Sequence, residues 1–183
     1  MDFYEKTIEN KEIFRGHFLN LKKDTVRLPN GKTSSREVVT HPGAVCVAAL
    51  TKNKEIILVK QYRYAISNLI LELPAGKLEK GELPLIAAKR ELTEETGIIG
   101  EDFKSLGYIY TSPGYSSEII YLYTCTAGTK GELCLDNDEF LEPVYIKLDL
   151  ALKMVLDDEI HDAKTQICLL KIAKLISEGR LDV

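Results

Sequence analysis

The hydrophobic pattern of the chain predicts a set of short buried strands. Val45 to Leu50 is an uninterrupted apolar run, and Ile56 to Val59 forms a second run after a polar turn. Apolar runs of about four to eight residues bounded by turn residues are typical of buried strands. Leu69 to Leu73 has the same character, and the segments 103–110 and 118–125 are rich in Tyr, Ile and Leu. We therefore expect these segments to pair as the strands of a sheet.

A helical period follows the first group of strands. Leu85, Ala88 and Leu92 recur at helical spacing and form an apolar stripe. Pro84 suits the first turn of a helix, because the N–H that proline lacks would have no partner there. Gly97 is a natural C-terminal stop, since glycine readily adopts the left-handed conformation that ends helices. The pattern predicts one amphipathic helix between the proline and the glycine.

Two more helical segments, at 149–156 and 163–178, end the chain. Asp149 and Asp162 stand at their starts, where an acidic side chain can accept a hydrogen bond from a free backbone N–H. The order of elements is strands, helix, strands and helices. That order predicts an α/β fold in which helices cover the faces of a mixed sheet.

The N-terminal region predicts a separate small antiparallel β-sheet. Thr25 to Leu28 and Arg36 to Val39 have strand character on either side of a Pro29-Asn30-Gly31 turn, and Phe14 to Leu19 adds a third segment. Three short strands bury little apolar surface on their own. We therefore expect this sheet to pack on the following domain or on a second subunit.

The turn at His41-Pro42-Gly43 predicts a boundary between an N-terminal sheet subdomain, residues 1–41, and a main domain, residues 42–183. The chain has 183 residues, of which 45% are hydrophobic and 28% are charged, as in a globular domain with a small appendage. Its formal net charge is −4 without a long lysine and arginine cluster, which argues against a nucleic acid polymer as ligand. No secretory segment and no apolar run of about 18 residues occurs, so we expect a cytoplasmic protein without a membrane span.

The predicted helix carries an unusual concentration of acids. Glu91, Glu94 and Glu95 lie within five positions, and Glu82 precedes them. Glu91 and Glu95 are spaced i,i+4, so their carboxylates project from one face about 5–6 Å apart, where like charges destabilise a helix. Arg90 alone cannot neutralise all of them. Two interpretations are open: an ordinary solvated charged face, or a site for hard divalent cations such as Mg²⁺ or Mn²⁺.

The segment from Gly76 to Ile98 resembles the Nudix signature G-x5-E-x7-R-E-U-x-E-E-x-G-U, in which U is a bulky aliphatic residue. Every fixed position matches, and these positions are Gly76, Glu82, Arg90, Glu91, Leu92, Glu94, Glu95, Gly97 and Ile98. So many specified positions in one short window make the motif specific. The resemblance, which covers residues 40–178, implies an α/β/α sandwich and a hydrolase that cleaves a nucleoside diphosphate linked to another group.

The resemblance also implies roles for the residues of the signature. Glu91 and Glu95 would be the principal ligands of two or more Mg²⁺ or Mn²⁺ ions, with Glu94 as a further ligand or helper. Arg90 would be a buried cation that orients the acids. The carbonyl of Ala75, in the turn before the helix, resembles the backbone metal ligand of the family.

Residues outside the signature resemble those of ADP-ribose pyrophosphatases. Such hydrolases place a phosphate-binding arginine thirteen residues before the signature glycine, where this chain has Arg63. They carry a proline about sixteen residues beyond the signature, often within Ser-Pro-Gly, which corresponds to Pro113 and Gly114. An acid that recognises adenine corresponds to Glu37, but Arg36 stands where the neighbouring stacking aromatic is expected.

A general base is also expected, and similar hydrolases take it from a loop before a late strand. The corresponding segment here is 138–142, and we select Glu139 as the base. Spacing alone does not separate Glu139 from Asp138 or Glu142, and Glu94 of the signature is a further alternative. A positioned base typically contributes about 10²–10⁴-fold to the rate.

The resemblance therefore implies Mg²⁺-dependent hydrolysis of ADP-ribose to AMP and ribose 5-phosphate. Hydrolysis of another nucleoside diphosphate sugar is the alternative, because the Ser-Pro-Gly loop indicates a subclass and does not identify the sugar. A non-catalytic ADP-ribose sensor is a third hypothesis, which the intact signature disfavours. The N-terminal sheet resembles the appended domain that such hydrolases exchange between subunits, so we expect a homodimer formed through residues 1–41.

Overall fold

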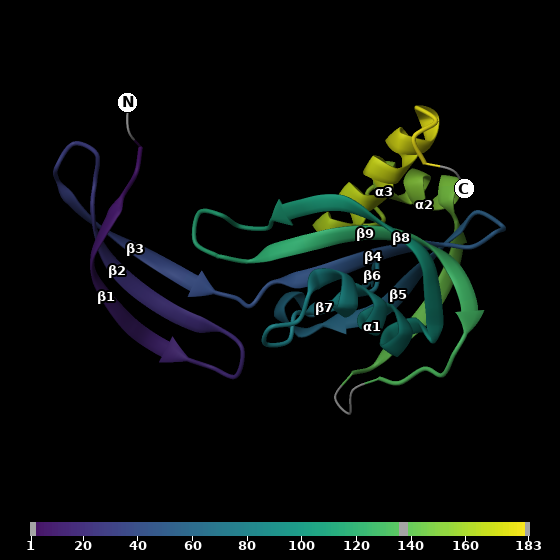
Figure 1. Ribbon diagram of the computed structural model, residues 1–183, viewed down its shortest axis with the longest axis horizontal. Helices are drawn as coiled ribbons and strands as arrows, with labels where there is room; N and C mark the ends of the chain where they lie inside the picture. Colours follow the sequence, from purple (N-terminus) through teal and green to yellow (C-terminus); the bar gives the residue numbers. More distant parts are fainter. Residues whose placement is uncertain (1–2, 136–138, 182–183) are drawn as a thin grey trace. The chain divides into compact units, whose positions relative to one another are not determined.

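The structure, a computed structural model of the protein, describes residues 3–135 and 139–181. The chain forms two compact units (Figure 1), one made of the residues up to Gly43 together with Tyr110–Ile119. The other unit is made of Ala44–Ile109 and the residues from Ile120 onward. The segment 110–119 therefore belongs with the N-terminal strands, which the sequence pattern did not indicate. The expected domain boundary between residues 41 and 42 stays a prediction.

The first unit contains a three-stranded antiparallel sheet in the order β1-β2-β3. Its strands are β1 (Lys6–Arg15), β2 (Asn20–Arg27) and β3 (Thr33–Thr40). Gly31 closes the β2–β3 turn with a φ of +81°, a conformation that favours glycine. The segment 110–119 lies against β3, because the Val39 N–H donates to the Tyr115 carbonyl at 2.7 Å and the Val39 carbonyl accepts from the Ser117 N–H at 2.9 Å. The predicted antiparallel sheet is thus present.

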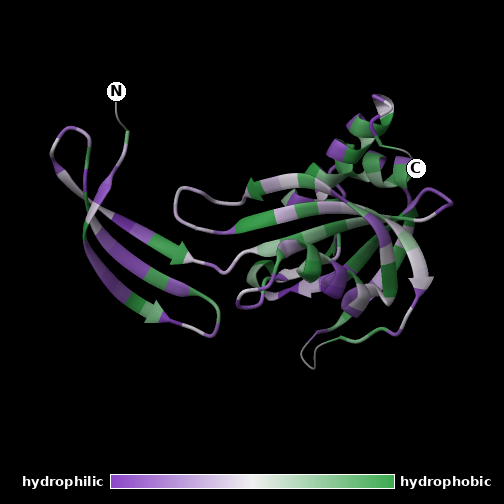
Figure 2. Cartoon of the chain, in the orientation of Figure 1, coloured by the Kyte–Doolittle hydropathy of each residue, from purple (hydrophilic) through white to green (hydrophobic). Residues whose placement is uncertain are grey.

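Its first strand differs from the prediction. We expected a strand over Phe14 to Leu19, whereas β1 ends at Arg15 and the next residues turn, with the Gly16 N–H donating to the Leu19 carbonyl at 2.8 Å. Every residue of β1 is exposed, so burial imposes no apolar alternation on it. Figure 2 shows hydrophilic residues along all three strands of this sheet. A strand without a buried face leaves little trace in a hydrophobic pattern.

The second unit is organised around a seven-stranded mixed sheet. Five strands run in the order β10-β5-β4-β9-β8, while β6 pairs with β5 and β7 pairs with β4. The strands are β4 (Ala44–Leu50), β5 (Glu55–Arg63), β6 (Asn68–Glu72), β7 (Ala75–Lys77), β8 (Ile98–Tyr110), β9 (Ile119–Lys130) and β10 (Leu141–Lys147). β4 runs parallel to β9, and its pairings with β5 and β7 are antiparallel. The segments predicted as strands pair as expected, but β9 extends to Lys130, beyond the predicted segment 118–125.

The helices are α1 (Pro84–Thr96), α2 (Leu148–Leu156) and α3 (Ala163–Ser177), with a short 3₁₀ turn at Tyr64–Ile66. Figure 1 shows α1 on one side of the sheet and α2 and α3 on the other. The alternating residues of β4 contact both layers, because Val45 and Val47 belong to the cluster with α1, while Cys46 and Ala48 belong to the cluster with α3. The predicted α/β/α sandwich is therefore confirmed.

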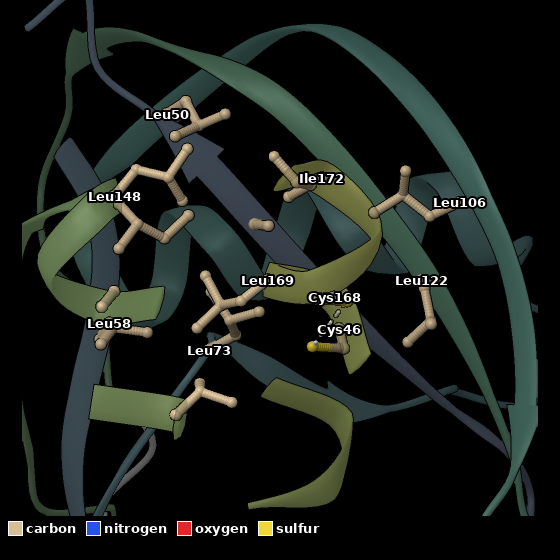
Figure 3. Close-up of a cluster of buried hydrophobic side chains, with 14 of the residues drawn as sticks. Cys46, Leu50, Leu58, Leu73, Leu106, Leu122, Leu148, Cys168, Leu169 and Ile172 are labelled. Atoms are coloured by element: carbon tan, nitrogen blue, oxygen red, sulfur yellow. Dashed lines mark hydrogen bonds between the residues drawn. The ribbon is translucent and has the colours of Figure 1, made fainter. Parts of the chain in front are cut away.

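The core between the sheet and α3 is built from fully buried side chains. Leu73, Leu122 and Leu169 are each 0% exposed, and they surround Cys46 and Cys168 in Figure 3. The two sulfur atoms lie 4.0 Å apart. Burial raises the pKa of Cys46 well above its usual value, so this thiol stays protonated and packs as a small apolar group.

Two details of the helices correct the sequence-based expectations. Leu85, which we placed in the apolar stripe of α1, is 38% exposed, and Ala87 is buried in its place. Lys147, and not Asp149, is the N-cap of α2, and Asp149 lies within its first turn. The N-cap of α3 is Asp162 as predicted, since its Oδ2 accepts from the Thr165 N–H at 3.0 Å. No helix in the described part of the chain is long and apolar enough to cross a membrane.

Candidate active site

The acidic residues of α1 lie partly inside the protein, at the face that packs on the sheet. Pro84 occupies the first turn, and Gly97 ends the helix with a φ of +67°. Glu91 is 8% exposed and Glu95 is 2% exposed, although both are carboxylates. A buried carboxylate is costly unless cations or hydrogen bonds stabilise it. An ordinary solvated charged face therefore does not describe α1.

β7 brings the backbone directly against these carboxylates. The Ala75 N–H donates to Glu95 Oε2 at 3.0 Å. A Cβ atom at Gly76 would lie only 2.0 Å from Cδ of Glu91 and 2.1 Å from its Oε1. Only glycine lets the strand approach so closely. The first glycine of the signature therefore has a structural reason, and Ala75 lies beside the second carboxylate.

Arg90 organises three of the acids with one guanidinium group. Its Nε and Nη2 donate to the two oxygens of Glu82 at 3.0 and 2.9 Å. Its Nη1 donates to Glu91 Oε1 at 2.8 Å and to Glu94 Oε2 at 2.9 Å, and Nη2 also reaches the Lys77 carbonyl at 3.2 Å. The hydrogen bonds with Glu82 lead the causes that hold the pKa of Arg90 well above its usual value. Arg90 thus positions Glu91 and links α1 to the loop before it.

The electrostatics of the site favour a bound cation. Burial raises the pKa of Glu91 to about 7, an effect that Arg90 opposes and Glu94 and Glu139 reinforce. Burial also raises the pKa of Glu95 to about 8, with added repulsion from Glu91 and Glu139. Without a cation these carboxyl groups therefore hold protons near neutral pH. A divalent ion would replace those protons and relieve the repulsion.

Oxygen donors of this kind fit a hard divalent metal. Glu91, Glu95 and the carbonyl of Ala75 belong to two adjacent elements, α1 and β7. Among the described residues, no three His, Cys, Asp or Glu side chains already converge as a metal-binding group. Glu91 is held by Arg90 through one oxygen, Oε1. The donor chemistry therefore suits Mg²⁺ or Mn²⁺, with a backbone oxygen completing the set.

Arg63 lies at the end of β5 and is bound to an acid that the sequence analysis missed. Its Nε donates to Glu72 Oε1 at 2.7 Å and its Nη2 donates to Oε2 at 2.8 Å. Glu72 is 1% exposed and also accepts from the buried Lys164 of α3. Glu72 could have been suspected from its sequence, because it is a charged residue between the apolar residues Leu71 and Leu73. Nothing in the sequence links it to Lys164, which lies 92 positions away.

Of the candidate bases, Glu139 is placed near the acids of α1. It is half-buried just before β10, and its charge contributes to the raised pKa values of Glu91 and Glu95. Asp138 lies outside the described residues. Glu142 is exposed on β10, and Glu94 is tied to Arg90. The charge of Glu139 thus acts on both Glu91 and Glu95, while its role as base stays a prediction.

The residues expected to recognise the nucleotide belong to the first unit. Glu37 is exposed on β3 and pairs in register with Lys23 of β2. Pro113 and Gly114 lie in an exposed turn, in which the Ser116 N–H donates to the Ser112 carbonyl at 2.8 Å. Their contacts with substrate stay predictions.

Arg36, which occupies the place of the expected stacking aromatic, forms an ion pair with Glu5. Its Nε donates to Glu5 Oε2 at 2.8 Å, and its Nη2 donates to Glu5 Oε1 at 2.5 Å. The guanidinium is thus already paired within the first unit. These hydrogen bonds lie along the edge of the guanidinium and do not identify a group that stacks on adenine.

Comparison with known proteins identifies the family. The NUDIX domain matches residues 39–166, and the nucleoside diphosphate sugar hydrolase N-terminal domain matches residues 5–39. A methanol dehydrogenase activator of Bacillus methanolicus is 47% identical over 169 residues, which are 91% of each chain. An ADP-ribose pyrophosphatase of Bacillus subtilis (strain 168) is 46% identical over 163 residues, or 88% of each chain. A crystal structure titled ADP compounds hydrolase has the same fold, with a TM-score of 0.85 at 20% identity over 99% of this chain and 100% of that one.

The matched NUDIX segment contains the complete signature from Gly76 to Ile98 and most of the sheet around it. The curated relatives span both units of the chain at high identity. The signature residues are also those that the structure gathers at the acidic face of α1. The chain belongs to the Nudix hydrolase family.

Proposed function

We propose that the protein hydrolyses the pyrophosphate bond of ADP-ribose, giving AMP and ribose 5-phosphate, with Mg²⁺ or Mn²⁺ as the required metal. One structural observation carries the proposal: Glu91 and Glu95 are buried carboxylates pressed against the backbone of Ala75 and Gly76. The relative named ADP-ribose pyrophosphatase, 46% identical over 88% of the chain, supports the choice of substrate.

Each residue has a chemical task in this hydrolysis. Glu91, Glu95 and the carbonyl of Ala75 would hold the metal, whose charge would stabilise the phosphate oxygens and favour deprotonation of the attacking water. Arg90 keeps Glu91 oriented through its 2.8 Å hydrogen bond. Glu139 would accept the proton of the attacking water, because its carboxylate lies near the two metal-binding acids.

Arg63 would bind a nonbridging oxygen of the diphosphate. Its side chain is 42% exposed, and the guanidinium remains charged because the Glu72 carboxylate holds the pKa of Arg63 above its usual value although burial opposes this. A planar guanidinium suits phosphate oxygens. Glu37, Pro113 and Gly114 would contact the rest of the nucleotide, as the family resemblance implies.

A cytoplasmic homodimer formed through the N-terminal sheet is part of the same proposal. β1 exposes every residue, including Ile8 and Ile13, both about half exposed, and Phe14, which is 59% exposed. Apolar residues gathered on an exposed strand favour burial against another surface. The match of residues 5–39 to the N-terminal domain of nucleoside diphosphate sugar hydrolases supports a role of this sheet in the enzyme.

The activity is tested by incubating the purified protein with ADP-ribose and Mg²⁺ and separating the products by chromatography. AMP and ribose 5-phosphate are the expected products, and none should form with EDTA. Glu95→Gln should lower kcat by roughly 10³-fold or more, because it removes a charged ligand. Glu159→Gln, at an exposed position between α2 and α3, is the control and should leave kcat unchanged.

A second candidate substrate is another nucleoside diphosphate sugar, which the N-terminal domain match favours. A panel of ADP-ribose, ADP-glucose, GDP-mannose and UDP-glucose at equal concentration separates the two substrates. The highest kcat/KM on ADP-ribose is the expected result. No turnover of ADP-ribose beside turnover of another member would assign the site to that sugar.

A further inference from the structure

Four charged side chains meet where α3 begins, beside the acids of α1. They are two cations and two acids, namely Arg63 from β5, Glu72 from β6, Asp162 at the N-cap of α3, and Lys164 from its first turn. All four belong to the second unit of the chain. The Nudix signature contains none of them, so the signature does not account for the cluster.

Lys164 is the buried centre of this cluster. Its side chain is only 11% exposed, and its Nζ donates to Glu72 Oε2 and, at 3.0 Å, to Asp162 Oδ1. Burial opposes its charge, but the carboxylates of Asp162 and Glu72 hold the pKa of Lys164 above its usual value. The cluster therefore contains two acids and two cations, and removal of Lys164 leaves one cation for the buried Glu72 and the partly buried Asp162.

Glu72 links Lys164 to Arg63, because its carboxylate forms ion pairs with both. Its two carboxylate oxygens accept hydrogen bonds from Nε and Nη2 of the Arg63 guanidinium at 2.7 and 2.8 Å. This pair of hydrogen bonds fixes the plane of the guanidinium. Within the described residues, Nη1 of Arg63 has no hydrogen bond of its own. Glu72 occupies Nε and Nη2 and the side chain is 42% exposed, so Nη1 is the donor that remains for an incoming phosphate.

The same end of α3 supports the segment that leads into β7, whose Ala75 is the expected backbone ligand. The Thr165 hydroxyl donates to Asp162 Oδ2 at 2.6 Å and accepts from the Leu73 N–H at 2.8 Å. Two residues beyond Leu73, the Ala75 N–H binds Glu95. The start of α3 is thus connected by hydrogen bonds both to Arg63 and to the chain beside the metal-binding acids.

We propose that Lys164 is a positioning residue of the active site, which holds Glu72 so that Glu72 presents Nη1 of Arg63 to the diphosphate. This inference rests on the proposed function, because it takes Arg63 as the phosphate-binding group. Lys164 acts through Arg63 and does not touch the substrate itself. Its loss should therefore weaken substrate binding more than it slows the chemical step.

The test compares Lys164→Met with Lys171→Met, which removes another lysine of α3 whose Nζ binds the Leu106 carbonyl. We expect K164M to raise KM for ADP-ribose roughly tenfold while kcat changes less than about threefold, and K171M to change neither. K164R, which keeps the charge, should recover part of the loss. In an R63A background, adding K164M should change KM less than about twofold, since the two residues act as one unit.

A KM effect of equal size in both backgrounds, or equal KM values for K164M and K171M, would overturn the inference. If K164M does not fold, Glu72→Gln keeps the shape of that side chain and should show the same increase in KM and the same dependence on Arg63.

A crystal structure of K164M without substrate provides a readout that needs no activity. Loss of the paired hydrogen bonds between Arg63 and Glu72 is expected there, and their retention would refute the positioning role. This outcome is separable from failure of the proposed function, which would show as a wild-type protein that leaves ADP-ribose intact.

Discussion

At position 76 the absence of a side chain allows β7 to lie against the Glu91 carboxylate. A Cβ there would stand 2.0 Å from Cδ of Glu91, far inside van der Waals contact. Either the strand or the carboxylate must then move, and both belong to the proposed metal site. Single residues therefore matter here through the space they leave as well as through their charge.

Gly76→Ala should lower kcat roughly 10²-fold or more while the protein stays folded, because a displacement of about 1 Å at reacting groups is costly. Steady-state kinetics and circular dichroism measure the two parts of this prediction. Gly131→Ala is the matched control, since a Cβ there meets its nearest atom at 3.5 Å. Equal activity of the two variants would show that Glu91 need not lie against β7.

Because Glu95 is buried and its pKa is raised, we expect the stability of the metal-free protein to depend on pH. The pKa of Glu95 is raised from 4.5 to about 8, so between these values the folded state binds more protons than the unfolded state. The stabilising contribution of the protonated group is complete below its unfolded pKa and is lost as the pH rises toward 8. For one group the slope reaches about 1.4 kcal/mol per pH unit.

Thermal unfolding in EDTA from pH 5 to pH 8.5 measures this effect. The wild-type Tm should fall as the pH rises, and Glu95→Gln should make this fall shallower, because an amide does not titrate while Glu91, with its pKa raised to about 7, still does. Saturating Mg²⁺ should raise the Tm most at high pH, where protons no longer compete for the site. Identical slopes for the two proteins would rule out Glu95 as the source.

At the scale of elements, the sequence predicted what local chemistry determines. Pro84 and Gly97 delimited α1 correctly, and Asp162 was identified as an N-cap. β1 was missed because all of its residues are exposed, and β7 was taken for a turn because only three residues pair with β4.

The site was predictable where its residues lie in one motif and not where they meet only in the fold. Glu91 and Glu95 share a helix face at i,i+4, a spacing that the sequence displays directly. Glu72 and Lys164 come from β6 and α3, and the ion pair between them exists only once α3 packs on the sheet. The hydrophobic pattern of neither β6 nor α3 indicates that Glu72 and Lys164 meet.

The cap of α3 gives a prediction about one element. Asp162→Ala should destabilise the protein by about 1–2 kcal/mol, because a helix N–H and the Thr165 hydroxyl lose their acceptor. Asp149→Ala, in the first turn of α2 without a side-chain cap, should cost less than about 1 kcal/mol. Urea denaturation of both variants measures the difference. If D149A proved as destabilising as D162A, the cap hydrogen bonds would not be the reason.

At the scale of the whole molecule, the proposed homodimer would bury the apolar residues that β1 exposes. Light scattering should give a mass twice the 20.6 kDa of the chain. Ile13→Lys should shift the protein toward monomer, because a lysine would have to lose its hydration in the interface. Ile99→Lys is the matched control, since both isoleucines are 49% exposed and Ile99 lies in the second unit. If light scattering gives the mass of a monomer for the wild-type protein, the proposed homodimer is wrong.

The central claim is that the buried acids of α1 hold cations against a diphosphate. The most direct measurement is anomalous diffraction from crystals soaked with Mn²⁺ and α,β-methylene ADP-ribose, whose diphosphate analogue resists hydrolysis. We predict manganese peaks at Glu91, Glu95 and the Ala75 carbonyl, in contact with the phosphonate oxygens. Manganese and diphosphate bound elsewhere, with Glu91 still paired only to Arg90, would contradict the account.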